Sequence, residues 1–407
     1  MARQKLFHYL SSPGQNREER DLEKNPLLKL RRFGQSVWLD FIRRGMLAPG
    51  ELQRLIEKDG LSGITSNPTI FEQAIAQSND YDEAIESLAR EGKTVDAIYL
   101  TLTVEDVQRA ADILRGVYER EKGTDGFVSL EVSPRLAYDT AGTIAEAKKL
   151  WSAVNRPNVL IKIPASTEGL PAITQLISAG INVNVTLLFG PARYEKVAAA
   201  YVAGLEERLA RGLGLDSVTS VASFFLSRID VSIDSLLEKI IQQGGGHAQR
   251  AAALHGRVAV ACAKVAYQAY KGISASARFR ALAAKGARPQ RLLWASTTAK
   301  NPAYSDVKYV GLLIGPKTIS TLSLDTLNAY RDHGRPDSRL QDAVAEAHKI
   351  LGRLTEVGIN LSEVTQQLEK EGVRRFTASF NALRLALEEK RAIALRKHGA
   401  RRDKADC

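Results

Sequence analysis

Short apolar runs that alternate with helical patterns constrain the fold of this chain more than any other feature. Eight runs rich in β-branched and other apolar residues recur, at 36–40, 63–67, 128–132, 159–164, 182–189, 220–228, 291–297 and 318–324. Most of the intervals between them contain an amphipathic helix pattern, as at 49–58 and 191–212. Strands that alternate with helices predict a parallel sheet, and eight such units favour a single α/β domain that closes into a (β/α)8 barrel.

Several of the intervals between runs are longer than the single helix that a minimal (β/α)8 barrel needs. The long interval between the second and third runs has room for additional helices at 80–90 and 104–118. The interval between the sixth and seventh runs contains Gly244-Gly245-Gly246, which predicts a flexible loop. We therefore expect a barrel with extra helices.

Two further helices are predicted after the eighth run, near 339–355 and 361–396. The second has four large apolar residues at packing intervals, Phe376, Phe380, Leu383 and Leu387. It is expected to pack over the barrel, where the two phenylalanines are also candidates to border the active site. Gly372 is a candidate break in this helix.

The net charge of +11 is concentrated at the two ends of the chain, where residues 1–35 and 390–407 supply nine of the eleven charges. The body is nearly neutral and carries no basic stripe, RNA-binding motif or zinc-finger motif, which argues against a specific nucleic-acid partner. We expect a mobile polar extension over 1–25, a barrel domain over 26–389 and a basic tail over 390–407. Such tails bind polyanions only weakly, at low salt.

Membrane and secretory signals are absent from the sequence. No apolar stretch approaches the roughly 20 residues that span a bilayer, and the first residues, Met-Ala-Arg-Gln-Lys, lack the apolar segment of a secretory signal. Cys262 and Cys407 form neither a disulfide framework nor a metal-ligand spacing. These features predict a cytoplasmic protein without membrane association. The oligomeric state is left open, with a homodimer as one candidate.

A lysine interrupts one of the apolar runs. Lys162 lies within 159–164, a run that reads as a buried strand ending at Pro164. Burial disfavours the charged form of a lysine, and a desolvated amine is a usable nucleophile. The other interpretation is an edge strand whose lysine faces solvent and prevents edge-to-edge pairing.

Other runs also carry polar side chains at or near their C-terminal ends, which meet at one mouth of a (β/α)8 barrel. These candidates are Asp40, Thr65, Asn67, Glu131, Asn184, Thr186, Ser223, Arg228, Ser296 and Lys300. Asp40 and the turn at 65–68 could equally well cap helices instead of serving the site. The Glu131 carboxylate costs free energy in an apolar run unless it is paired or protonated. Together with the Lys162 amine, the set contains carboxylates for proton transfer, amides and hydroxyls for a polyol, and cations for a phosphate. These are the side chains that a Schiff-base aldolase needs.

Four segments, in order, resemble the signatures of the transaldolase family. They are Gly63-Ile-Thr-Ser-Asn-Pro-Thr-Ile-Phe, Val159-Leu-Ile-Lys-Ile-Pro-Ala, Asn182-Val-Asn-Val-Thr-Leu-Leu-Phe and Ser220-Val-Ala-Ser-Phe-Phe-Leu-Ser-Arg. The second resembles the signature around the Schiff-base lysine of that family. The resemblance extends from about residue 26 to residue 387.

The resemblance implies a reaction of the pentose phosphate pathway, in which a dihydroxyacetone unit passes from sedoheptulose 7-phosphate to glyceraldehyde 3-phosphate. Lys162 would attack the donor ketone, Asp40 would take the C4 hydroxyl proton, and Glu131 with Thr186 and a bound water would shuttle protons. The implied substrate contacts are Asn67, Asn184 and Ser223 for the dihydroxyacetone unit, and Arg228, Ser296 and Lys300 for the phosphate. Thr65 is a further candidate substrate contact. No metal or organic cofactor is implied, because the iminium is the electron sink.

The chain departs from the family pattern after its seventh run. Short members place an arginine close after the serine, whereas here Lys300 follows Ser296-Thr-Thr-Ala. A lysine supplies the same positive charge, but it cannot form the bidentate hydrogen bonds of an arginine guanidinium. This arrangement resembles the longer bacterial subfamily. The alternative function is a fructose 6-phosphate aldolase-like enzyme on the same scaffold that releases free dihydroxyacetone.

Overall fold

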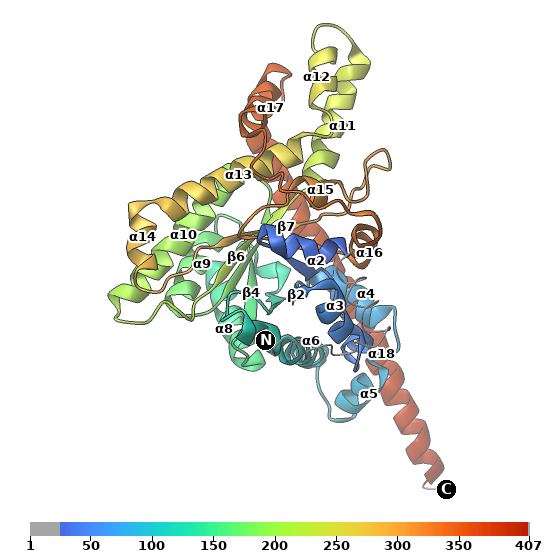
Figure 1. Cartoon of the computed structure of the whole chain (residues 1–407). Helices are drawn as coiled ribbons and strands as arrows, with labels where there is room; N and C mark the ends of the chain where they lie inside the picture. Colours follow the sequence, from blue (N-terminus) through green and yellow to red (C-terminus); the bar gives the residue numbers. More distant parts are fainter. Residues whose placement is uncertain (1–24, 406–407) are drawn as a thin grey trace, which may run out of the picture.

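The computed structural model describes the backbone of residues 25–405 and the side chains of residues 25–396. Its parallel strands close into an eight-stranded barrel in chain order, with β8 paired back to β1. Figure 1 shows the helices arranged around these strands. The strands are β1 (Gln35–Leu39), β2 (Leu61–Ile64), β3 (Phe127–Glu131), β4 (Val159–Pro164), β5 (Val183–Leu188), β6 (Ser220–Phe225), β7 (Arg291–Ala295) and β8 (Thr318–Leu322). The predicted (β/α)8 barrel is confirmed.

Helices surround the barrel and connect its strands. They are α2 (Pro26–Leu30), η1 (Arg31–Phe33), η2 (Arg44–Leu47), α3 (Glu51–Asp59), α4 (Pro68–Ala76), α5 (Asp82–Arg90), α6 (Val95–Ile113), α7 (Arg115–Arg120), η3 (Pro134–Leu136), α8 (Thr140–Val154), α9 (Gly169–Ser178), α10 (Pro191–Ala210), α11 (Ser227–Gln243), α12 (Ala248–Leu254), α13 (Val258–Ala275), α14 (Ala277–Ala283), α15 (Lys308–Leu312), α16 (Leu324–His333), α17 (Val344–Glu356) and α18 (Leu361–Ala405). None of these described helices combines the length and apolar character needed to cross a bilayer.

The strands are buried on both faces, which explains why the sequence shows continuous apolar runs rather than strict alternation. All residues of β3, β4, β5 and β6 are buried. One face of each strand packs against the surrounding helices, and the other fills the barrel interior. Polar side chains on the inner face, such as Ser129 and Asn184, therefore lie at depths where they need partners.

Seven of the eight strands end earlier than predicted, and at β1, β2 and β6 the difference changes which element carries a polar residue. Asp40 follows β1, and β2 ends at Ile64, so Thr65 lies in the following loop. Asn67 caps α4 by accepting hydrogen bonds from the backbone N–H groups of Thr69 and Ile70, which ends the extended segment. Arg228 lies in the first turn of α11 rather than in a strand.

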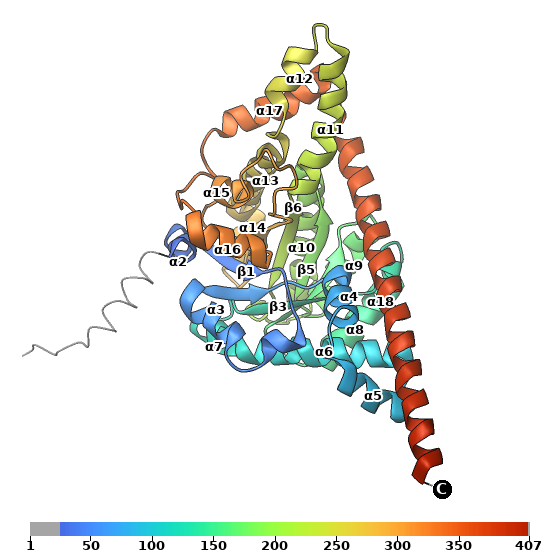
Figure 2. The same cartoon turned by 90° about the vertical axis from the view of Figure 1, so that its right-hand side faces the viewer.

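The long helix α18 passes along one side of the molecule from α11 to α5 (Figure 2). Contrary to expectation, Gly372 does not break it. A Cβ at Gly372 would lie 2.8 Å from Cδ2 of Leu187, so the glycine lets α18 approach the end of β5 closely. The helix continues through residue 390, where the Lys390 Nζ donates a hydrogen bond to the Ser78 carbonyl oxygen.

The proposed division into extension, barrel and tail remains a prediction. Residues 1–24 of the predicted extension lie outside the described residues. Residue 390, where we placed the start of the basic tail, is inside α18.

Gly63 in β2 marks a close approach to Trp38 in β1. A Cβ at this position would lie 2.4 Å from the indole ring, which is fully buried and whose Nε1 donates a 2.8 Å hydrogen bond to Asp125. Because the ring cannot withdraw, we expect Gly63→Ala to lower the free energy of unfolding by about 1–3 kcal/mol, measured by urea denaturation. Gly272→Ala is the matched control, since an added methyl in this exposed part of α13 meets nothing within 4 Å. An equal loss in both variants would contradict the packing explanation.

Candidate active site

Lys162 lies at the centre of the barrel, between two polar residues of neighbouring strands. In the sheet register it pairs with Glu131 of β3 on one side and Asn184 of β5 on the other. Its side chain is 3% exposed, and its Nζ donates a 3.1 Å hydrogen bond to the Ser66 carbonyl oxygen. The edge-strand interpretation is therefore wrong, because β4 is an interior strand of a closed barrel.

The Glu131 carboxylate is the nearest charge to this amine, with Oε2 lying 3.6 Å from the Lys162 Nζ. This is an ion-pair contact, longer than a hydrogen bond. Burial raises the pKa of Glu131 to about 7, although the neighbouring Lys162 charge opposes this shift. Glu131 is thus both paired and able to gain or lose a proton near neutral pH, which satisfies the condition expected of a carboxylate in an apolar run.

Thr186 and Glu131 share an unusual feature. Within the part of the chain that the structure describes, the Thr186 hydroxyl and both Glu131 carboxylate oxygens are buried without a hydrogen-bond partner. Buried polar groups of this kind are usually hydrogen-bonded to protein or to water. The two side chains therefore have free capacity for a small polar molecule.

A cavity of about 300 Å³ opens at the C-terminal ends of the strands, and Lys162 contributes to its lining. Eight of the eleven predicted site residues surround it, namely Asp40, Thr65, Asn67, Lys162, Ser223, Arg228, Ser296 and Lys300. The other three, Glu131, Asn184 and Thr186, do not line this cavity and are buried in β3 and β5. The geometry thus brings most of the predicted set together around one amine.

Asn184 contacts its neighbours with both ends of its side-chain amide. Its Oδ1 accepts a 2.7 Å hydrogen bond from the Ser223 hydroxyl, and its Nδ2 donates one of 2.9 Å to the Ser129 hydroxyl. Asn184 therefore orients Ser223, which does line the cavity. Sequence reasoning missed Ser129, because a serine in an apolar run gives no distinct signal.

The sequence left open whether Asp40 and Asn67 cap helices, and the structure gives a different answer for each. Asp40 caps no described helix, and its Oδ1 accepts a 2.6 Å hydrogen bond from the Thr65 hydroxyl. Asn67 does cap α4 through its Oδ1, while its Nδ2 donates no hydrogen bond within the described residues. The Thr65 hydroxyl also lies 2.8 Å from that of Thr321, a lining residue of β8 that sequence reasoning missed.

Arg228 and the segment after β7 form the positively charged end of the cavity. The Ser227 hydroxyl lies 2.8 Å from that of Ser296, which ties the start of α11 to the end of β7. The Arg228 guanidinium packs 5.7 and 5.9 Å from the ring centroids of Phe225 and Phe376. Burial, and next the charge of Arg375, lower the pKa of Arg228. Of the two phenylalanines expected near the site, Phe376 lines the cavity, whereas Phe380 packs on Tyr99.

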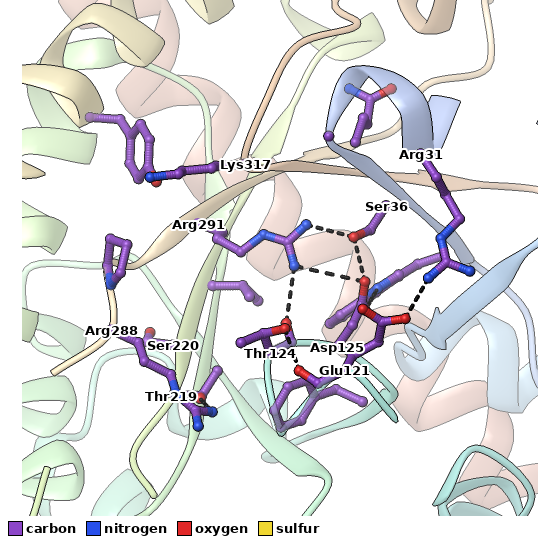
Figure 3. Close-up of a pocket in the computed structure, with 17 residues that line it drawn as sticks. Arg31, Ser36, Glu121, Thr124, Asp125, Thr219, Ser220, Arg288, Arg291 and Lys317 are labelled. Atoms are coloured by element: carbon purple, nitrogen blue, oxygen red, sulfur yellow. Dashed lines mark hydrogen bonds and ion pairs between the residues drawn. The ribbon is translucent and has the colours of Figure 1, made fainter. Parts of the chain in front are cut away.

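A second pocket, of about 460 Å³, lies at the opposite end of the barrel, where the strands begin (Figure 3). Its charged side chains are largely engaged with one another and with the backbone. Arg31 pairs with Glu121, and Arg291 donates hydrogen bonds to the Ser36 hydroxyl and the Thr124 carbonyl oxygen (Figure 3). These contacts join the starts of the strands to the segment before β3. The strand-end cavity, with its amine and acidic partner, is therefore the candidate active site, as is usual in this fold.

Comparison with known proteins gives a consistent result. The family model for transaldolase/fructose-6-phosphate aldolase matches residues 37–387. The chain is 48% identical to a transaldolase of Trichodesmium erythraeum over 370 residues, which cover 90% of this chain and 97% of that protein. It is also 48% identical to a transaldolase of Thiobacillus denitrificans over 352 residues, covering 86% and 96%, and 46% identical to transaldolase 2 of a Nostoc species over 371 residues, covering 90% and 97%. The match includes all eight strands apart from the first two residues of β1, and it also includes most of α18.

Proposed function

The chain belongs to the transaldolase/fructose-6-phosphate aldolase family and is a transaldolase of the longer bacterial type, and we propose that it forms its Schiff base at Lys162. The observation that supports this site is a buried amine, 3.6 Å from a carboxylate whose pKa is raised to about 7, at a cavity at the strand ends. A transaldolase acts on sugar phosphates. The names of the relatives give no support to the alternative enzyme that releases free dihydroxyacetone.

The first step joins the donor to the protein. Glu131 takes a proton from the Lys162 ammonium, and the freed amine attacks the donor ketone to give a carbinolamine. Glu131, through Thr186 and a bound water, then returns the proton to the carbinolamine hydroxyl, which leaves as water and gives the iminium. The unpartnered oxygens of Glu131 and Thr186 support this route.

The second step breaks the C3–C4 bond of the donor. Asp40 takes the proton of the C4 hydroxyl, the bond electrons move into the iminium to give an enamine, and the aldose phosphate leaves. Asn67 and Ser223 hold the hydroxyls of the remaining dihydroxyacetone unit, with Thr65 orienting Asp40 and Asn184 orienting Ser223. The acceptor aldose then reverses these steps on the same enamine.

The finer assignments are part of the same proposal. Arg228, Ser296 and Lys300 bind the substrate phosphate, since all three line the positive end of the cavity. The donor is sedoheptulose 7-phosphate and the acceptor glyceraldehyde 3-phosphate, giving erythrose 4-phosphate and fructose 6-phosphate. We place the enzyme in the cytoplasm, without an organic cofactor or metal, and name a homodimer as the assembly to test by light scattering.

Borohydride reduction in the presence of fructose 6-phosphate tests the site directly. We expect a reduced dihydroxyacetone adduct on the peptide that contains Lys162, because reduction converts the iminium into a stable secondary amine. The measurement is the intact mass followed by a peptide map. Lys162→Met should give no adduct, whereas Asp40→Asn should still be trapped with free dihydroxyacetone. An adduct on Lys300, the other lysine of the cavity, would overturn the assignment.

A further inference from the structure

A larger cavity, of about 840 Å³, continues from the active-site cavity between α11 and α18. The two cavities share Arg228, Ser296 and Lys300. The larger one is also lined by Arg375, which projects from α18, the helix that runs beside α11 (Figure 2). The positive end of the active site therefore extends to a residue that lies far away in the sequence.

Three cations line the larger cavity without a hydrogen bond to a carboxylate. Arg228, Lys300 and Arg375 make no hydrogen bond or ion pair with any other residue that the structure describes, and the Arg228 guanidinium lies against the rings of Phe225 and Phe376. Other arginines of the chain behave differently. Arg156 forms a bidentate pair of hydrogen bonds with Asp112, and Arg331 forms one with Asp59.

The fold holds Arg228 and Arg375 close enough for their charges to interact unfavourably. Burial and the Arg375 charge both lower the pKa of Arg228, which means that its charged form is destabilised in the free protein. Like charges in a partly desolvated site are costly unless an anion lies between them.

The carboxylates of the same cavity form no hydrogen bond or ion pair with these cations, although the Glu371 charge partly opposes the lowering of the Arg228 pKa. Glu363 and Glu371 also line the cavity. Glu371 lies one helical turn before Arg375, where an ion pair would be expected, but it accepts a hydrogen bond from Gln367 instead. Glu363 accepts one from Asn360. The donors of the guanidinium groups thus stay available for a ligand.

We propose that Arg375 is a specificity-determining residue that binds the substrate phosphate together with Arg228 and Lys300. This inference rests on the proposed function. A phosphate dianion presents several oxygens, so guanidinium groups from α11 and α18 can each donate to it. Arg375 thereby supplies from the C-terminal helix the second guanidinium fork that the segment after β7 lacks, since Lys300 provides only a point charge. The neighbouring Phe376 fixes this part of α18 against the active site.

Kinetics of Arg375→Gln test the proposal. We expect KM for fructose 6-phosphate to rise about tenfold, because a charge-assisted hydrogen bond to the phosphate is lost. Turnover of unphosphorylated fructose, and borohydride trapping with free dihydroxyacetone, should be unchanged. Arg375→Lys should restore part of the phosphate preference. Arg374→Gln is the matched control, because Arg374 is the adjacent exposed arginine of α18 but does not line the cavity.

The outcomes separate this inference from the function on which it rests. An unchanged KM for fructose 6-phosphate in Arg375→Gln, with trapping intact, would overturn the role of Arg375 alone. An equal loss with phosphorylated and unphosphorylated donors, or an equal loss in Arg374→Gln, would also overturn it and indicate a structural effect. Failure to trap an adduct in the wild-type protein would instead overturn the Schiff-base assignment of Lys162.

Discussion

Lys162→Met is expected to lower kcat by on the order of 10⁴-fold or more, because the covalent route through the iminium is lost. Among residues 25–396, no other lysine is placed to replace it. Lys300, the second lysine of the cavity, is exposed and lies after β7 rather than beside the acidic partner Glu131. The measurement is the rate of acceptor-dependent transfer from fructose 6-phosphate to erythrose 4-phosphate at saturating donor.

Lys162→Arg separates the amine chemistry from the charge. An arginine keeps a cation near Glu131 but cannot serve as the nucleophile, so this variant should be as inactive as Lys162→Met. Activity of Lys162→Arg within tenfold of the wild-type value would show that the residue acts through its charge alone. Both proteins should fold: in Lys162→Met the buried Glu131 loses its cationic partner, stays protonated at pH 6 and carries no unpaired charge, and in Lys162→Arg it keeps a cation beside it. Circular dichroism at that pH is the control.

The barrel could be predicted from the sequence because its strands are buried on both faces. A run such as Val159 to Pro164 is apolar at almost every position, and helical patterns occupy most of the intervals. The same burial makes Lys162 stand out, because a lysine in such a run has no solvent to face. The position of Glu131 and Asn184 beside Lys162 follows from the register of adjacent parallel strands.

Local signals could not predict where α18 runs. Gly372 has the helix-breaking tendency expected of a glycine, but its packing against Leu187 outweighs that tendency, and only the folded structure shows this neighbour. The approach of Arg375 to Arg228 likewise depends on the packing of α18 against α11. An exposed arginine on a charged helix gives no sequence signal, because most such residues are only solvated.

Glu131→Gln is expected to lower kcat/KM for the donor by about 10²–10⁴-fold, the usual contribution of a positioned acid or base. It should also change the pH dependence. In the wild-type protein kcat/KM should rise with pH through about 7, because burial raises the pKa of Glu131 to about 7. Below this pH Glu131 already holds a proton and cannot accept the one that Lys162 must lose. Above it the carboxylate is ionised and acts as the base. In Glu131→Gln this rise should disappear.

The Glu131 carboxylate, whose pKa burial raises to about 7, lies 3.6 Å from the Lys162 Nζ. Glu146→Gln is the matched control. Burial also raises the pKa of Glu146, but this side chain lies on α8 and accepts the backbone N–H of Ser133, a contact that glutamine can keep. Glu146→Gln should therefore retain the wild-type rate and pH profile. If Glu131→Gln retained the rise through pH 7, the ionisation would belong to another group, and Glu131 would not be the base that frees the Lys162 amine.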